Sequence, residues 1–285
     1  MGHDMSQPNT PKRQLRLGAF IMPTGHHIAA WRHPGSQADS GVNIDHYIEV
    51  AKTAERGLFD QVFVADSPGI WHQGDDESFS RQGRVSHFEP VTLWAALSAV
   101  TQHIGFVATA STTYEDPFLL ARKFASLDHI SQGRAAWNVV TTSAESVHGN
   151  FGLDAHPDPA TRYERAHEFV EVVKGLWDSF EDDAFSRDKD SGIYFDPHKL
   201  HKLNHVGQHF KVSGPLNIER PPQGHPVIVQ AGSSEDGKEL AAATAEWVGN
   251  EPETPLALMG DFNIAPLDTD VWDMAEFVGA THVSA

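Results

Sequence analysis

Short apolar runs alternate with amphipathic segments along most of the chain, and this alternation constrains the fold more than any other feature. The runs lack the polar–apolar alternation of a half-exposed strand, and they are typical of strands buried on both faces. Strands of this kind, separated by helices, form a parallel sheet with helices on its faces. The predicted strands cover residues 17–22, 61–65, 104–109, 135–140 and 226–230.

Helical spacing and capping residues fill the intervals between these strands. Asp116–Pro117 gives one helix an N-cap with proline at its first position, and Gly57 ends another. A strand–helix unit recurs every ~30–45 residues, which suits a (β/α)8 barrel of the TIM type or a doubly wound sheet. The predicted helices cover residues 44–56, 90–101, 117–130, 162–177 and 233–245.

Composition excludes several classes of protein. The chain has 285 residues, no cysteine, and 21 basic against 39 acidic residues, which gives a net charge of −18. The lack of cysteine excludes disulfide scaffolds, thiol catalysis and cysteine-ligated metals. The acidic balance argues against nucleic acid as a partner, because binding a phosphate backbone needs a basic surface. No apolar run is long enough to cross a bilayer. The composition therefore predicts a cytoplasmic enzyme with neither a nucleic-acid nor a membrane partner.

Polar and small residues follow the predicted strands, where the active site of a β/α barrel is built. Asp66 follows the second strand and offers a carboxylate either to a ligand or to the next turn as a cap. Residues 232–234, Gly-Ser-Ser, precede the last predicted helix. They favour either an anion at the helix terminus or an ordinary N-cap. His26 and His27 follow the first strand and are candidates for cofactor or substrate contact, or are surface residues.

A metal site is a weaker alternative. His201, His205 and His209 stand at four-residue steps, which would place them on one face of a helix as metal ligands. Gly207 and the polar surroundings indicate a loop instead. We therefore predict no metal site.

Ordered stretches from about Leu17 to about Val248 resemble the luciferase-like flavin monooxygenases. The nearest branch is that of the nitrilotriacetate, EDTA and dibenzothiophene-sulfone monooxygenases. The stretches that carry the resemblance are Gly25–His27, Phe63–Asp66, Ala121–His129, Gly133–Thr142, Arg162–Tyr163 and Gln230–Ser234.

The resemblance implies a TIM barrel that binds reduced FMN supplied by a separate flavin reductase. With dioxygen, such an enzyme oxygenates a carbon, nitrogen or sulfur centre of a small organic substrate. By position, Asp66, Thr112, Tyr163 and Ser234 correspond to the family's FMN contacts, whereas no catalytic residue is implied. We expect the substrate pocket to be shaped by variable loops that include residues 181–214.

One position departs from the family pattern. The family usually has a histidine four residues before the equivalent of Tyr163, and this chain has Pro159 there. We expect the loss of this donor to weaken cofactor binding by about 1 kcal/mol.

The resemblance divides the chain into three parts. Residues 1–14 are polar and are interpreted as a flexible leader, not a signal peptide. Residues 15–248 correspond to the barrel, which is incomplete at its C-terminal end because family members are considerably longer. An incomplete barrel leaves an open sheet edge. We therefore expect low stability or a homo-oligomer.

The third part, residues 249–285, resembles a different family, the exonuclease III-type endonucleases and phosphodiesterases. Gly260–Pro266 is similar to their Gly-Asp-Phe-Asn motif, and by that resemblance Asp261 and Asn263 would be a catalytic pair. The metal-binding glutamate and catalytic histidine of that family are not found in this sequence. We therefore interpret the tail as an inactive fragment joined to the barrel.

Three functional hypotheses follow from the sequence. The favoured one is an FMN-dependent monooxygenase. The second is a catalytically inactive fusion of two gene fragments, and the third and weakest is a metal-dependent phosphodiesterase. The sequence does not name the substrate.

Overall fold

A computed structural model describes residues 16–70, 75–231 and 234–241 of the chain. The chain divides into two compact units, and the boundary falls between Ile228 and Val229. The first contains nearly all the described helices and strands. The predicted leader, residues 1–14, and the predicted exonuclease-like tail with Asp261 and Asn263 lie outside the described residues.

The main sheet has five strands in the order β1-β2-β3-β4-β7. Strands β1, β2, β3 and β4 pair in parallel, so the predicted parallel sheet is confirmed. A separate antiparallel pair is formed by β5 and β6. The strands are β1 (Gly18–Phe20), β2 (Gln61–Val64), β3 (Gly105–Ser111), β4 (Ala135–Val140), β5 (His205–Val206), β6 (Lys211–Val212) and β7 (Val227–Val229).

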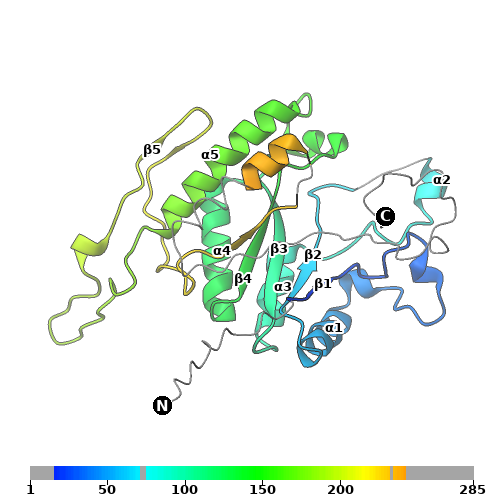
Figure 1. The fold of residues 1–285 in the computed structure, drawn as a ribbon, viewed down its shortest axis with the longest axis horizontal. Helices are drawn as coiled ribbons and strands as arrows, with labels where there is room; N and C mark the ends of the chain where they lie inside the picture. Colours follow the sequence, from blue (N-terminus) through cyan, green and yellow to red (C-terminus); the bar gives the residue numbers. More distant parts are fainter. Residues whose placement is uncertain (1–15, 71–74, 232–233, 242–285) are drawn as a thin grey trace, which may run out of the picture. The chain divides into compact units, whose positions relative to one another are not determined.

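Helices connect the parallel strands, and acidic or amide side chains cap their first turns. Asn43, Glu89, Asp116 and Asp158 each accept a backbone N–H from the helix that follows. Figure 1 shows α4 and α5 side by side next to β4. The helices are α1 (Ile44–Arg56), α2 (Asp76–Phe79), α3 (Pro90–Ser98), α4 (Pro117–Ser131) and α5 (Pro159–Trp177). Short 3-10 helices are η1 (Ala30–Arg32), η2 (Ser40–Val42), η3 (Glu145–Phe151) and η4 (Pro197–Lys199).

The start of α5 differs from the sequence prediction. The helix begins at Pro159, three residues before the predicted Arg162. Asp158 is its N-cap, and its carboxylate accepts the backbone N–H of Thr161 at 3.1 Å. Proline fits the first helical position because its missing N–H would have no partner there.

The core lies between the sheet and its helices, and three tryptophans fill much of it. Trp94, Trp137 and Trp177 are almost fully buried. Each indole N–H donates to a backbone carbonyl oxygen at 2.9–3.1 Å, so none of these rings buries an unpaired polar group. Strand β4 is buried on both faces over most of its length, as the apolar run predicts.

Arg134 anchors the amino end of the sheet. It lies directly before β4, and its guanidinium donates to the carbonyl oxygens of Ser98, Thr101, Ile104 and Ser131 at 2.6–3.2 Å. One cationic side chain therefore satisfies carbonyl groups at the ends of α3 and α4 and before β3.

Two carboxylates complete this end of the sheet. Glu55 accepts three backbone N–H groups of residues 102–104 at 2.6–3.1 Å. Asp128 is fully buried and accepts the backbone N–H groups of Ala135 and Gln223 at 3.2 and 3.0 Å. Burial raises the pKa of Asp128, because a low-dielectric environment disfavours the carboxylate, although these hydrogen bonds oppose the shift.

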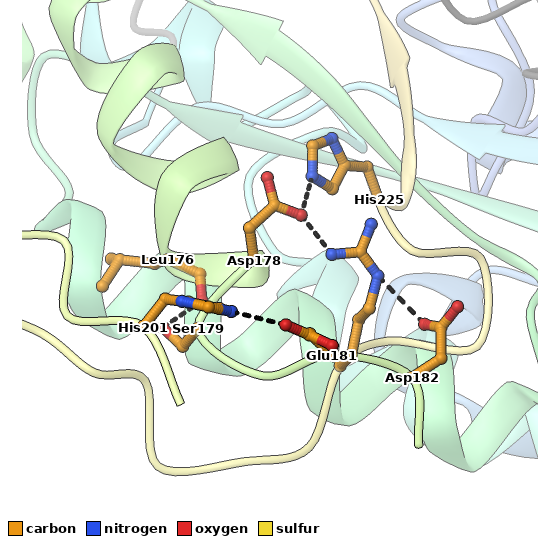
Figure 2. Close-up of polar contacts among 8 residues, drawn as sticks. Leu176, Asp178, Ser179, Glu181, Asp182, His201 and His225 are labelled. Carbon is orange, nitrogen blue, oxygen red and sulfur yellow. Dashed lines mark hydrogen bonds and ion pairs between the residues drawn. The ribbon is translucent and has the colours of Figure 1, made fainter. Parts of the chain in front are cut away.

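A further charged cluster follows the end of α5 (Figure 2). Asp178 pairs with Arg220 and lies 2.9 Å from Nε2 of His225, and Arg220 also contacts Asp182 at 3.1 Å. Burial opposes ionisation of Asp178, but hydrogen bonds and charges from His225 and Arg220 outweigh it. The pKa of Asp178 therefore lies below its usual value. The cluster ties the end of α5 to the segment before β7.

The segment between α5 and β7, which includes β5 and β6, packs along α5 (Figure 1). Glu168 on α5 lies 2.9 Å from Nε2 of His205 and accepts the backbone N–H groups of His209 and Phe210 at 2.8 and 2.9 Å. The Arg165 guanidinium stacks over the Phe210 ring at 4.2 Å.

The described strands and helices form an α/β fold with a parallel sheet, as the sequence predicts. Closure into an eight-stranded barrel is not seen among the described residues. In the same part of the chain, every helix is too short or too polar to span a bilayer.

Candidate active site

A cavity of about 660 Å³ opens at the carboxyl ends of β2, β3 and β4. This volume is within the range that holds a cofactor or a drug-sized ligand. Small and hydroxyl side chains at the strand ends line it, together with the segment between β2 and α3. The strand-end residues are Ala65, Asp66, Thr109, Ala110, Ser111 and Val140.

Asp66 and His87 form the central polar pair of the cavity. Oδ1 of Asp66 lies 2.8 Å from Nε2 of His87, and both side chains are partly buried. The hydrogen bond and the negative charge of Asp66 raise the pKa of His87. Within the described residues, Oδ2 of Asp66 has no hydrogen-bond partner, so this oxygen is available to a donor on a ligand.

The other two carboxylates that line the cavity bind elsewhere in the chain. Glu89 caps α3 and accepts the backbone N–H groups of Val91 and Thr92 at 2.9 and 2.7 Å. Glu115 forms an ion pair with Lys123 on α4 at 3.0 Å. These two residues therefore support the cavity wall.

Two polar groups of the cavity are buried without a hydrogen-bond partner in the described part of the chain. They are Nε of Arg84 and Oγ of Ser67. Unpaired buried donors are rare because each costs free energy. Both groups can donate a hydrogen bond to a ligand.

Tyr114 and His156 form a second pair at the cavity wall. The Tyr114 hydroxyl lies 2.6 Å from Nδ1 of His156, and the Tyr114 ring stacks on Phe151 with centroids 4.6 Å apart. Tyr114 and Phe151 line the cavity. Burial lowers the pKa of His156, and the nearby charge of Arg162 adds to this effect. His156 therefore favours the neutral imidazole.

His156 lies close in the sequence to Pro159, which stands where the resembling family usually has a histidine. The imidazole that the resemblance places at position 159 is absent, because Pro159 forms the first turn of α5. His156 lies three residues earlier, and its Nε2 is buried with no partner among the described residues. This histidine contacts the cavity wall through Tyr114.

The four residues predicted to contact FMN occupy different positions. Asp66 lines the cavity, whereas Thr112 and Tyr163 do not line it in the described structure. Thr112 is fully buried beside the cavity-lining Ser111, and its carbonyl oxygen accepts a hydrogen bond from Arg165 on α5 at 3.1 Å.

Tyr163 lies in the first turns of α5, near the strand exits. Its neighbour Arg162 donates to the carbonyl oxygens of Thr141 and Thr142 at 3.2 and 2.7 Å, directly after β4. At the end of β4, the carbonyl oxygen of Val140 also accepts a hydrogen bond from the Thr112 hydroxyl at 3.3 Å. The amino end of α5 is thereby fixed against the ends of β3 and β4.

Ser234 belongs to the second unit. Its hydroxyl accepts the backbone N–H of Gly237 at 3.1 Å, and its carbonyl oxygen accepts that of Lys238 at 2.9 Å. This is the pattern of an N-cap, the alternative that the sequence left beside anion binding. Residues 233 and 242–245 of the predicted helix lie outside the described residues.

The other histidine candidates do not line the cavity. Nε2 of His26 lies 3.3 Å from the Phe20 carbonyl oxygen, and His27 accepts the backbone N–H of Ala29. His201 and His205 pair with two different glutamates, Glu181 and Glu168. The described residues contain no group of three or more histidine or acidic side chains that could hold a metal ion.

The expectation that residues 181–214 help to shape the substrate pocket stays a prediction, and this cavity does not support it. None of the described residues that line it belongs to the segment 181–214. That segment packs along α5 instead, through the contacts of Glu168. The segments that do line the cavity follow β1, β2 and β3, together with η3, which ends at Phe151.

Sequence reasoning did not find Arg84, His87 and His156. They lie in loops, where neither helical spacing nor a strand exit marks them. Residue type was their only signal, since arginine and histidine side chains beside a strand exit are candidates for ligand contact.

Comparison with known proteins identifies the family. The family model described as luciferase-like monooxygenase matches residues 22–262. This chain is a member of the luciferase-like monooxygenase family. It is 57% identical over 237 residues to N-acetyl-S-(2-succino)cysteine monooxygenase of Bacillus subtilis (strain 168), covering 83% of this chain and 52% of that protein.

Two further relatives extend the comparison. Nitrilotriacetate monooxygenase component A of Aminobacter aminovorans is 50% identical over 248 residues, covering 85% of this chain and 55% of the relative. A crystal structure of riboflavin lyase with modified FMN and riboflavin has a TM-score of 0.76 and 34% identity, covering 90% of this chain and 64% of that one. This luciferase-like chain thus spans about half the length of the two monooxygenases.

Proposed function

We propose that this chain is a flavin-dependent monooxygenase that uses reduced FMN and dioxygen to oxygenate a small organic substrate. The observation that carries the proposal is the cavity at the strand carboxyl ends of a luciferase-like chain. In that cavity lies Asp66, which the resemblance assigns to FMN, with one carboxylate oxygen open to a ligand. The cavity is where enzymes with parallel β/α units build their active sites.

The residues of the cavity fit a flavin. Its walls combine apolar side chains such as Met22 and Val140 with hydroxyl groups at the end of β3. An isoalloxazine ring is a flat, largely apolar group with polar edges, and it needs this mixture. We propose that Asp66, Thr112, Tyr163 and Ser234 hold the cofactor. The riboflavin lyase crystal structure, of similar fold, contains a modified FMN.

When bound, reduced FMN supplies the activation of dioxygen and the transfer of one oxygen atom to the substrate. The chain binds and orients the reactants and excludes water from them. His87 and Asp66 hold one proton between Nε2 and Oδ1, 2.8 Å apart, at the cavity surface. Tyr114 and His156 hold another across 2.6 Å.

The partners follow from the chemistry. A flavin that must arrive reduced needs a separate flavin reductase, and the printed name of one relative describes a component of a larger system. Homo-oligomerisation and a cytoplasmic location stay predictions from the sequence.

The test is a titration of the full chain with FMN, followed by flavin fluorescence quenching. We expect saturable quenching, weakened about tenfold by Asp66→Ala because one charge-assisted hydrogen bond is lost. Asp45→Ala, which removes an exposed carboxylate on α1, serves as the matched control and should change nothing. Folded protein that does not quench flavin fluorescence would contradict the proposal.

Turnover is tested with a flavin reductase, NADH and ¹⁸O-labelled dioxygen. N-acetyl-S-(2-succino)cysteine and nitrilotriacetate, named for the two relatives, are the first substrates to supply. Incorporation of one ¹⁸O atom into an organic product is the expected result. Flavin binding without incorporation would favour the inactive-fusion hypothesis.

A further inference from the structure

Arg84 carries a positive charge that no described residue neutralises. It is the only lysine or arginine among the described residues that line the cavity. Its Nε is buried without a partner, and its guanidinium forms no ion pair with the described part of the chain. Because a buried unpaired donor costs free energy, this arrangement favours a ligand that accepts hydrogen bonds from Arg84.

The acidic residues of the cavity do not supply the missing partner. Asp66 pairs with His87, and Glu115 pairs with Lys123. Glu89 binds backbone N–H groups at the start of α3. Each of these three carboxylates therefore pairs with a group other than Arg84, although the whole chain has an excess of acidic residues.

Ser67 provides a second donor in the same cavity. Its Oγ is buried and lacks a hydrogen-bond partner among the described residues. A guanidinium presents several N–H groups in a rigid plane that matches a carboxylate, and a hydroxyl adds one more donor. Around these polar groups, Ile28, Ile70 and Val85 line the cavity with half-exposed apolar surface.

We propose that Arg84, assisted by Ser67, binds a carboxylate of the substrate, so that the enzyme takes organic acids with an apolar body. This inference rests on the proposed function, because it concerns the substrate of the same cavity. Arg84 then determines specificity, since a substrate without an acceptor would leave its buried Nε without a partner among the described residues. The phosphate of FMN is also an oxyanion, and the experiment separates the two sources of charge.

The experiment measures the binding of one compound in two forms. The full chain is titrated by calorimetry with N-acetyl-S-(2-succino)cysteine and with its trimethyl ester, each with and without FMN. The variants are Arg84→Met, Arg84→Lys and, as the matched control, Arg81→Met. Arg81 lies on the same segment, is exposed and pairs with Glu77. Urea unfolding confirms that each variant is folded, and FMN and riboflavin are titrated in parallel.

We expect the acid to bind at least about tenfold more tightly than the ester. Arg84→Met should remove this preference and leave the affinity for the ester, FMN and riboflavin unchanged. Arg84→Lys should retain part of the preference, because it keeps the charge without the planar fork. Arg81→Met should bind like the wild type.

Three results would overturn the proposal. In the first, folded Arg84→Met keeps the preference for the acid. In the second, the wild type binds acid and ester equally or binds neither. In the third, Arg84→Met weakens FMN but not riboflavin, which assigns the guanidinium to the cofactor phosphate. If FMN does not bind, only the proposed function is contradicted. The calorimetry without FMN still decides the role of Arg84.

Discussion

Two arginines at opposite ends of the parallel sheet differ in every contact. Arg134, before β4, donates to carbonyl oxygens of Ser98, Thr101, Ile104 and Ser131. Arg84, in the cavity at the carboxyl ends, has a buried Nε with no partner among the described residues. The first guanidinium completes the fold. The second has hydrogen-bonding capacity that the described residues do not use.

The polar groups around the two arginines show the same difference in pairing. At the amino ends, Glu55 and Asp128 each accept several N–H groups. At the carboxyl ends, Ser67 and one oxygen of Asp66 lack partners in the described residues. Buried polar groups without a partner are rare in folded proteins, and a bound ligand is one way to pair them. The comparison therefore separates the residues that stabilise the protein from those that bind.

The largest predicted effect concerns stability. Arg134→Ala should lower the free energy of unfolding by about 3 kcal/mol, because it leaves buried carbonyl groups unpaired. Arg84→Ala should lower it by no more than about 0.5 kcal/mol. Urea denaturation of the two variants checks this. Equal losses in both would remove the distinction between the two ends.

A smaller effect on stability tests whether a residue that lines the cavity can stabilise the fold without binding a ligand. Glu89 lines the cavity but caps α3 through Val91 and Thr92. Glu89→Ala should lower the free energy of unfolding by about 1 kcal/mol, as for other lost N-caps. The dissociation constant of FMN should stay unchanged, and an increase measured by fluorescence quenching would place Glu89 among the binding residues.

The smallest predicted effect is the pH dependence of the stability that the His87–Asp66 pair contributes. The pKa of His87 is raised in the folded chain, so its pairing with Asp66 stabilises fully below about pH 6.5, the unfolded value. This contribution is lost as pH rises through the folded value. The difference in unfolding free energy between wild type and His87→Gln should be under about 1 kcal/mol at pH 6 and smaller at pH 9.

The cluster around Asp178 should respond in the opposite window. The pKa of Asp178 is lowered, so its contribution is present above about pH 3.9, the unfolded value, and is lost as pH falls through the folded value. Asp178→Asn should therefore differ from wild type at pH 6 and less so at pH 3. Urea denaturation at the two pH values measures this. A pH dependence shared by both variants would argue against two independent regions.

Much of the fold could be predicted from local patterns. The helix 44–56 and the strand 135–140 match α1 and β4 at both ends, because apolar spacing, Gly57 and Gly133 mark these elements locally. The amino end of α5 was missed by three residues, although Asp158–Pro159 repeats the capping pattern of Asp116–Pro117. The segment 181–214 was expected to shape the substrate pocket, and its packing along α5 was not predicted.

The candidate site could be predicted only in part. Asp66 was found because it follows a strand at the end where parallel β/α units build their sites. Arg84, His87 and His156 were not, since loop residues carry no periodic signal. His87 reaches Asp66 from 21 residues away in the sequence, and His156 reaches Tyr114 from 42.

The amino-acid sequence by itself determined the main strands and helices, the parallel sheet and the family, because these depend on local spacing, on capping and on an ordered series of similar stretches. Only the tertiary structure decided which polar groups meet and which remain unpaired. Pairing of this kind depends on distances between segments that are far apart in the chain. The partners of Arg134 and the lack of a described partner for Arg84 are therefore visible in the folded chain alone.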